Sequence, residues 1–418
     1  MKSNLNTDFE LNNKGTSNAE DTRSLARHRW YFYKEGFSPS LVKKAFEENN
    51  ISTNDIILDP FNGSGTVTLT AATEGIQSIG FEVNPFTSFL SVAKTTNLSQ
   101  KRFKEISDTV LHNSDKGAHS SLENYSTFSK NDHKGIDKWL FNTEVLKAFS
   151  GGLNGLGSIG SKSSKLTSLA LISAIMKNCN AKKDGKCLRY KNNWNELNFD
   201  KYSFLESLEK DLSIIYDDLD KNVQKTPIIK TGDSRKLISK LDQKFKLCIT
   251  SPPYLNTFDY TDIYRPELFL GGFLTSSEEL RKLRFQTVRS HVQVNWEKSK
   301  LIDFGGHFND VFARISEKKE LLMHKNIPDM ITAYFEDMEN ILRDLKTKAA
   351  DNASLWFVVS TSAYANEHIP VDLILADIAT KVGWKLKEIG VLREINKRKT
   401  KYSPDINKLR ESVVILNS

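Results

Sequence analysis

Residues 56–66 read IILDPFNGSGT, and this stretch decides the fold of the chain. The apolar run Ile56–Leu58 predicts a short buried strand, and a helical pattern follows the loop. Gly63 and Gly65 lie between strand and helix, where they let a ligand approach the backbone and the free N–H groups of the helix. The loop lacks the third glycine of a dinucleotide fingerprint and the Gly-Lys-Ser/Thr of a phosphate loop. Dinucleotides and nucleoside triphosphates are therefore disfavoured as ligands.

A second strand is predicted directly after this helix, over Ser78–Glu82. Its last residue is a carboxylate, and an acidic residue at the end of the second strand is placed to accept both hydroxyls of a ribose. The alternative for Glu82 is a solvated strand end. Asn84 and Pro85 then predict the start of another helix, which extends to about Lys94.

The stretch Ile249–Tyr254 reads ITSPPY and follows the strand-like run Phe245–Cys248. Two consecutive prolines make a stiff turn whose carbonyl oxygens remain free to accept hydrogen bonds. Ser251 adds a hydroxyl and Tyr254 an aromatic face, a combination that suits a flat group with an exocyclic amine. Taken alone, the same letters also fit a structural Pro-Pro turn.

Composition sets the outer bounds on function. The 418 residues are 39% hydrophobic and 27% charged with a net charge of +7, which is ordinary for a globular protein and only suggestive of a polyanionic partner. No apolar run is long enough for a membrane span and no signal peptide is recognisable, so we expect a cytoplasmic protein. The three cysteines lack disulfide or zinc spacing, so no metal site is expected.

The two motifs DPFNGSGT (59–66) and TSPPY (250–254) together resemble those of the S-adenosylmethionine-dependent DNA methyltransferases that modify exocyclic amines. This is the cytosine-N4 and adenine-N6 group. The resemblance covers residues 24–95 and 228–260 well and the final strands more loosely. It implies a Rossmann-like seven-stranded α/β sheet with helices on both faces and helical insertions for target recognition.

The resemblance also implies roles for individual residues. S-adenosylmethionine is the implied cofactor, with the aromatic segment Tyr31–Pro39 forming part of its pocket. Asp233 resembles the acidic residue that reaches the cofactor's adenine, although it also fits an N-cap. The implied cofactor-binding residues are Asp59, Pro60, Phe61, Gly63, Gly65, Thr66, Glu82 and Asp233. The implied catalytic residues, which hold the flipped base, are Ser251, Pro252, Pro253 and Tyr254.

Six segments are predicted along the chain. They are a disordered leader (1–22), the cofactor half of the catalytic domain (23–100), a mainly helical insertion (101–225), the catalytic core with the SPPY motif (226–260), a second insertion (261–327) and the C-terminal half of the catalytic domain (328–418). The first insertion has helical patterns near 137–149, 166–177 and 202–219, and we expect residues 151–157 (GGLNGLG) to form a flexible turn. Either insertion is a candidate for contact with DNA.

Three clusters of basic residues are candidate nucleic-acid contacts, and a solvated loop is the alternative for the first of them. They comprise Lys177, Lys182, Lys183, Lys186, Arg189 and Lys191; Arg281, Lys282, Arg284, Arg289, Lys298 and Lys300; and Arg393, Lys397, Arg398, Lys399 and Lys401. Tyr190 and Trp194 lie within the first cluster and are suited to stacking on bases.

An exocyclic amine is a poor nucleophile because its lone pair is delocalised into the ring. Ser251 Oγ and the Pro252 carbonyl are assigned as acceptors for its hydrogens, with Tyr254 stacking on a base that has left the duplex. In the family, Ser before Pro-Pro-Tyr is typical of cytosine-N4 enzymes, whereas Asp or Asn is typical of adenine-N6 enzymes. The favoured function is thus site-specific cytosine-N4 methylation of double-stranded DNA, in a restriction-modification or related defence system with a cognate restriction endonuclease as a candidate partner. Adenine-N6 methylation, RNA base-amine methylation and non-catalytic binding are the alternatives.

Overall fold

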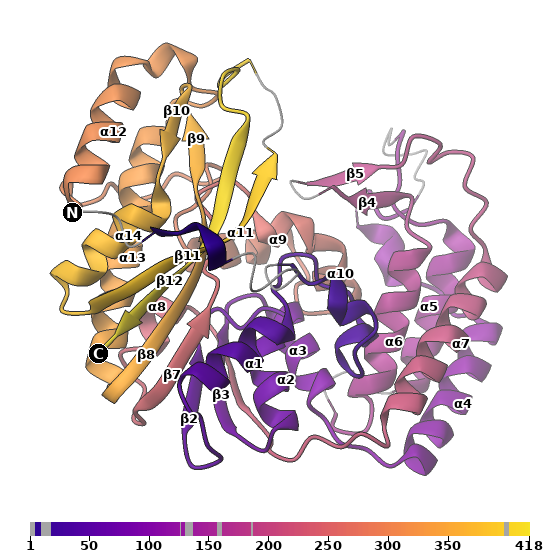
Figure 1. Ribbon diagram of the computed structural model, residues 1–418. Coiled ribbons are helices and arrows are strands. Elements are labelled where there is room, and N and C mark those ends of the chain that lie inside the picture. Colours follow the sequence, from indigo (N-terminus) through magenta and orange to yellow (C-terminus); the bar gives the residue numbers. More distant parts are fainter. Residues whose placement is uncertain are drawn as a thin grey trace.

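The computed structural model describes residues 5–9, 18–125, 127–129, 137–156, 161–184, 187–396 and 401–418. Within these residues eight strands form one sheet, in the order β1-β11-β12-β8-β7-β2-β3-β6 (Figure 1). All run parallel except β12, which is antiparallel to both of its neighbours. The strands are β1 (Leu5–Asn6), β2 (Ile56–Asp59), β3 (Gln77–Glu82), β6 (Ile228–Thr231), β7 (Phe245–Thr250), β8 (Ala349–Ser360), β11 (Lys385–Asn396) and β12 (Lys408–Asn417).

The central strands are apolar on both faces because helices cover both faces of the sheet. In β7, Leu247 and Ile249 pack towards one face and Cys248 towards the other. One face is covered by α1 (Pro39–Glu48), α2 (Thr66–Thr73) and α3 (Pro85–Lys94), and the other by α8 (Ser234–Leu237), α12 (Gly306–Glu317), α13 (Ile327–Lys348) and α14 (Val371–Lys381). The predicted Rossmann-like sheet is confirmed, and β1 extends it beyond the expected seven strands.

The first insertion forms a separate helical body beside the sheet, at the right of Figure 1. It consists of α4 (Gln100–Lys116), the 3₁₀ turn η4 (Ser121–Asn124), α5 (Thr143–Leu156), α6 (Lys165–Lys177), α7 (Lys201–Asp218) and a two-stranded hairpin of β4 (Ala181–Lys183) and β5 (Leu188–Tyr190). Its apolar core is continuous with residues of α3 and α10, so the body is packed against the catalytic domain. The hairpin lies at the top of this body (Figure 1).

The expected flexible turn at residues 151–157 is wrong over its described part, because Gly151, Gly152 and Gly155 lie inside α5. These glycines allow α5 to pack closely on α4. A Cβ at Gly151 would lie 2.2 Å from the carbonyl oxygen of Asn113, and one at Gly152 would lie 2.5 Å from Ser114 Oγ. The small residues therefore serve helix packing rather than a turn. Gly157 lies outside the described residues.

The expected disordered leader is also wrong where residues 1–22 are described. Leu5 and Asn6 pair with β11, and the 3₁₀ turn η1 (Thr7–Phe9) buries Phe9 against Trp356 with ring centroids 6.4 Å apart. A Cβ at Gly390 would lie 2.6 Å from the Phe9 ring, so this glycine makes room for it. A single aromatic residue thus anchors a segment of otherwise polar composition.

The second insertion and the C-terminal half complete the chain. The insertion contains α9 (Tyr260–Ile263), α10 (Arg265–Leu270), α11 (Ser277–Gln286), α12 and the 3₁₀ turn η6 (Lys319–Leu321), and a small hairpin of β9 (Ser362–Tyr364) and β10 (Glu367–Ile369) follows β8. The N-terminal region adds the 3₁₀ turns η2 (Glu20–Arg23) and η3 (His28–Trp30). In the part of the chain that the structure describes, no helix is both long and apolar enough to cross a membrane.

Candidate active site

The glycine loop between β2 and α2 is held by a network beneath it. Gly63 and Gly65 have φ of +50° and +84°, a region that favours glycine. Asn62 donates from its side chain to Ser91 Oγ at 2.7 Å and accepts from Thr68 Oγ1 at 2.8 Å. A Cβ at Gly65 would lie 2.6 Å from Ser91 Oγ, so the loop cannot carry a larger residue there without displacing α3.

Two carboxylates lie at the ends of β2 and β3, the buried Asp59 and the half-buried Glu82. Asp59 accepts from Thr250 Oγ1 at 2.6 Å, which links the glycine loop to the strand of the TSPPY motif, and from the N–H of Phe61 at 3.1 Å. Glu82 accepts from the N–H groups of Gly63 at 2.7 Å and Asn84 at 2.8 Å. Burial raises the pKa of Asp59 to about 7 and raises that of Glu82 as well. Among the described residues, neither carboxylate forms an ion pair.

Asp233 lies on the wall of the same cavity, but its side chain is already engaged. It caps α8 by accepting from the N–H of Arg235 at 3.0 Å. The Arg235 guanidinium also donates to both oxygens of Asp233, at 2.9 Å and 3.0 Å. The N-cap alternative is therefore what the structure shows, and contact with the cofactor's adenine stays a prediction.

The TSPPY turn places a hydroxyl and a phenol in contact with a buried charge. Ser251 Oγ lies 3.4 Å from Tyr254 Oη, and Tyr254 donates to Glu411 Oε1 at 2.7 Å. Arg393 Nε donates to the other carboxylate oxygen of Glu411 at 2.8 Å. Thr257, just beyond the turn, has a φ of +66°, which is rare for a β-branched residue, and its N–H donates to Ser290 O at 3.1 Å. This strained contact fixes the turn to the 287–291 segment.

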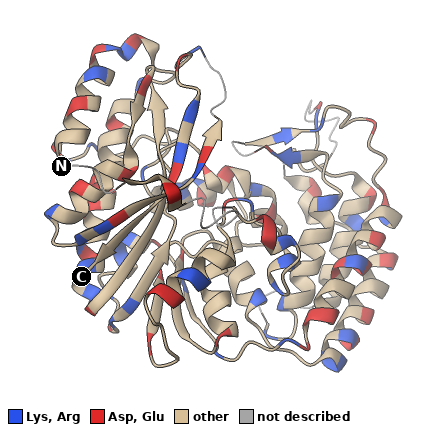
Figure 2. Cartoon of the chain, viewed as in Figure 1, with Lys and Arg blue, Asp and Glu red and all other residues tan. Residues whose placement is uncertain are grey.

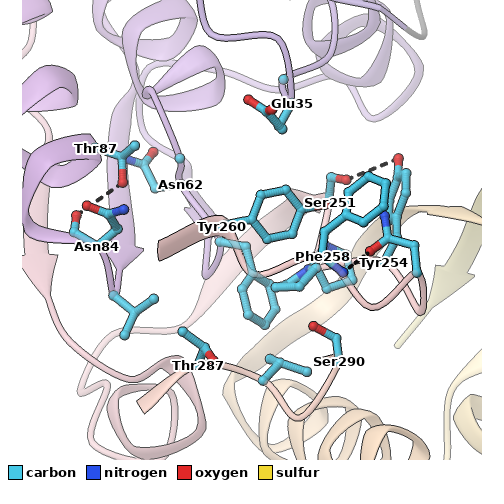
Figure 3. Close-up of a pocket in the computed structure, with 18 of the residues that line it drawn as sticks. Glu35, Asn62, Asn84, Thr87, Ser251, Tyr254, Phe258, Tyr260, Thr287 and Ser290 are labelled. Atoms are coloured by element: carbon cyan, nitrogen blue, oxygen red, sulfur yellow. Dashed lines mark hydrogen bonds between the residues drawn. The ribbon is translucent and has the colours of Figure 1, made fainter. Parts of the chain in front are cut away.

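Both motifs open into one cavity of about 460 Å³. In Figure 3, Asn62, Asn84 and Thr87 lie at one side and Ser251, Tyr254 and Phe258 at the other, with the Tyr260 ring between them. Every residue predicted for cofactor binding or catalysis lines this cavity except Gly65, which ends the loop as the N-cap of α2. The segment Tyr33–Phe37 contributes a further wall, as the resemblance implies.

Several lining residues were not identified from the sequence. Arg393 was assigned to a DNA-contacting cluster, and Glu411, which faces Arg393 across the β11–β12 pair, was not singled out. The only sequence signal was a charged residue near the start of the apolar strand at 413–416. Phe258 and Tyr260 follow the TSPPY turn in the chain, and Glu35 comes from the aromatic segment.

Many of the basic residues expected to contact DNA form internal ion pairs instead. Arg284 pairs with Asp259 at 2.5 Å, and Arg289 pairs with Glu336 and Asp337, both at 2.7 Å. Lys183 pairs with the fully buried Glu267. These side chains fix the loops around the cavity. Lys186, Lys397, Arg398 and Lys399 lie outside the described residues.

Comparison with known proteins gives a consistent assignment. Residues 16–92 match the N6_N4_Mtase family model, which is described as "DNA methylase". The type II methyltransferase M.BsoBI of Geobacillus stearothermophilus is 28% identical over 473 aligned residues, which cover 97% of this chain and 88% of that protein. These matches support an amino DNA methyltransferase of the N4/N6 group. The type II methyltransferase M.AvaI of a Nostoc species is 26% identical, over 88% of this chain and 81% of that protein.

Likeness to solved structures is more distant. The rRNA methyltransferase aviRa of Streptomyces viridochromogenes shares 11% identity and a TM-score of 0.32, over 96% of this chain and 92% of that chain. The fold assignment of this methyltransferase therefore rests on its own strand order.

Similarity to this group implies S-adenosylmethionine as cofactor, and the residues at the glycine loop fit it. The sulfonium and ammonium groups of the cofactor are cationic, and the buried Asp59, which forms no ion pair among the described residues, suits such a ligand. The half-buried Glu82, at the end of β3, is placed for the ribose hydroxyls. The glycine loop allows close approach to the backbone. Among the described residues, no group of His, Cys, Asp or Glu side chains is arranged to hold a metal ion.

Proposed function

We propose that this methyltransferase modifies the N4 amine of a cytosine in a specific sequence of double-stranded DNA. The observation that carries the proposal is the junction of the two motifs: the Thr250–Asp59 hydrogen bond, 2.6 Å long, joins the cofactor half of the cavity to the turn that bears Ser251. A hydroxyl at this position is typical of cytosine-N4 enzymes in the family. The type II relatives support site-specific methylation, in a restriction-modification or related defence system.

The residues of this chain position the base rather than activate it covalently. Ser251 Oγ and the Pro252 carbonyl accept the hydrogens of the amine, which localises the nitrogen lone pair towards the cofactor half. The rings of Tyr254, Phe258 and Tyr260 form an apolar slot for a flat base. S-adenosylmethionine supplies the methyl group from its sulfonium. Proximity and orientation then account for most of the rate.

Cysteine chemistry at a ring carbon does not fit this site. Cys248 is buried within β7, and burial raises the pKa of its thiol. Cys179 is buried in the helical insertion and Cys187 is exposed between β4 and β5, and neither of them lines the cavity. Transfer to an amine needs no thiolate, which agrees with the chemistry that we propose.

Duplex DNA is the substrate that best fits the surroundings of the cavity. Figure 2 shows basic side chains on the β4–β5 hairpin and on the β11–β12 ends that face it. Lys182 and Arg189 are exposed on the hairpin and Lys408 on β12. Phosphate contacts by such residues provide affinity that is independent of sequence, and the base that enters the cavity must leave the helix. A cognate restriction endonuclease is a candidate partner in the same system.

The test is to express the chain in a host without DNA methylation and to sequence its DNA by a single-molecule method that detects modified bases. We expect N4-methylcytosine in one fixed sequence, and strongly reduced modification of that sequence with Ser251→Ala. Methylated adenine in a fixed sequence would contradict the choice of base. Modification of RNA but not DNA would contradict the substrate, and folded protein with no modification of either would contradict methyl transfer itself.

A further inference from the structure

A line of three side chains leads from the base-binding turn to a buried carboxylate. Ser251 Oγ lies 3.4 Å from Tyr254 Oη, and Tyr254 Oη lies 2.7 Å from Glu411 Oε1. Glu411 is only 4% exposed, yet it lines the cavity. Arg393 holds its second oxygen at 2.8 Å. A buried charged side chain on a strand inside the sheet needs such partners, and their arrangement points into the site.

The carboxylate fixes the direction of every hydrogen bond in this line. An ionised carboxylate only accepts, so Tyr254 must donate its proton to Glu411. The phenol oxygen can then accept from the Ser251 hydroxyl. With its own proton directed to Tyr254, Ser251 Oγ presents lone pairs to the cavity, which is what an amine donor requires. Without Glu411, either hydroxyl is free to rotate and present a proton instead.

We propose that Glu411 is a positioning residue for methyl transfer, which orients Ser251 as an acceptor and receives through Tyr254 the proton that the amine releases. The inference rests on the proposed function, because it requires an amine as the acceptor group. Transfer forms one N–C bond, breaks the donor's S–C bond and leaves one surplus proton on the nitrogen. Ser251 takes this proton and passes its own to Tyr254, whose proton goes to Glu411. The carboxylate becomes a neutral acid, which later releases its proton to water.

The surroundings of Glu411 suit both of its charge states. Arg393 faces it from β11, Tyr254 from the turn after β7 and Tyr260 from α9, while β8 places the uncharged Ser360 opposite it. Burial raises the pKa of Glu411, whereas Arg393 and the Tyr254 hydroxyl oppose that shift. The carboxylate therefore stays ionised beside Arg393 but is more basic than an exposed glutamate.

The experiment is a pH profile of single-turnover methyl transfer to DNA at saturating S-adenosylmethionine. At saturating S-adenosylmethionine, protonation of Asp59 or Glu82 changes the affinity for the cofactor but not the measured rate. The wild type should lose rate as the pH falls through the pKa of Glu411. Glu411→Gln should be slower by about 10²-fold and lack this acid limb, because Gln cannot take up the proton. Glu394→Gln is the matched control, since Glu394 is an exposed residue of β11 outside the cavity, and it should behave as wild type.

Two further measurements keep the inference falsifiable if Glu411→Gln folds poorly. Tyr254→Phe keeps the aromatic ring but removes the hydroxyl that connects Ser251 to Glu411. Its rate should therefore also no longer fall at low pH, while its affinity for the cofactor is unchanged. In protein without cofactor, infrared spectroscopy should detect the carbonyl band of protonated Glu411 with the same midpoint as the acid limb. If the rate of Tyr254→Phe or Glu411→Gln still falls at low pH as in the wild type, or if the infrared midpoint differs, the role of Glu411 is contradicted while the proposed function stands. Failure of the wild type to transfer methyl groups would instead overturn the proposed function.

Discussion

The cavity has a cofactor half at the glycine loop and a base half at the TSPPY turn, and the carboxylates of the two halves differ in their partners. In the cofactor half, the buried Asp59 and the half-buried Glu82 accept only from N–H and hydroxyl groups. In the base half, Glu411 is paired with Arg393, and Asp259 with Arg284. The first half therefore gains most from a cationic ligand, whereas the second is already neutralised and suits an uncharged base. One fold thus prepares adjacent sites for ligands of different charge.

The largest effect that we expect comes from the base half. Ser251→Ala removes an acceptor for the amine and should lower the single-turnover rate by about 10²-fold or more, because preorganised groups at the reacting atoms have effects of this size. The affinity for S-adenosylmethionine should not change, since Ser251 belongs to the other half. Single-turnover kinetics and calorimetry check the two parts. An equal loss of rate and of affinity for S-adenosylmethionine would show that the cofactor half and the base half of the cavity do not act separately.

A comparably large loss of stability is expected from Arg289, which fixes the 287–291 wall of the base half. Its guanidinium pairs with Glu336 and Asp337 on α13 and is only 12% exposed. Arg289→Gln removes the cationic partner of Glu336 and leaves Asp337 with Arg235 alone, and it should lower the free energy of unfolding by about 3 kcal/mol. Lys282→Gln, at an exposed pair with Glu278, should change it by about 0.5 kcal/mol or less. Denaturant unfolding measures both changes. An Arg289→Gln variant as stable as the wild type would contradict this structural role of Arg289 and favour contact with DNA instead.

The cofactor half is tested by the pH dependence of cofactor affinity. Burial raises the pKa of Asp59 from about 3.8 to about 7, so the free protein binds a proton there at low pH. A cationic ligand favours the ionised form, and its affinity should therefore increase as the pH rises through about 7. Asp59→Asn should bind about 10- to 100-fold more weakly at high pH and show little pH dependence. Calorimetry with S-adenosylmethionine measures this, and a flat wild-type profile would contradict the assignment of Asp59.

The close contact of α4 and α5 predicts a smaller loss of stability. Gly151→Ala improves helix propensity by about 1 kcal/mol but places a Cβ against the Asn113 carbonyl. Overpacking costs about 1–3 kcal/mol, so the midpoint of thermal unfolding should fall. Gly306→Ala is the control, because a Cβ at Gly306 meets nothing within 4 Å. A higher midpoint for Gly151→Ala would contradict the close contact of α4 and α5 at this residue.

The smallest effect is expected outside the cavity. Lys182→Ala removes one exposed cation from the β4–β5 hairpin, and it should weaken DNA binding uniformly across sequences. The slope of log affinity against log salt should become shallower by about 1. Fluorescence anisotropy at several salt concentrations measures this slope, and no change would exclude Lys182 from the interface.

The sequence predicted the sheet and the position of both motifs because these depend on local signals. Glycines, prolines and apolar runs determine the loop at 59–66 and the turn at 250–254. It did not identify Glu411, whose role depends on the register of β11 and β12. It also misread Arg284, Arg289 and the glycines of α5, because charge partners and helix contacts come from residues far away in the chain. Local patterns revealed the cofactor half better than the base half.

Methyl transfer by the purified chain tests the central claim most directly. Unmethylated duplex DNA is incubated with methyl-labelled S-adenosylmethionine, digested to nucleosides and analysed by mass spectrometry. We predict label in N4-methylcytosine with the wild type and, within the same reaction time, label that is lower by about 10²-fold or more with Ser251→Ala of equal stability. Label in RNA but not DNA under matched conditions, or no label although the protein is folded and binds S-adenosylmethionine, would contradict the claim.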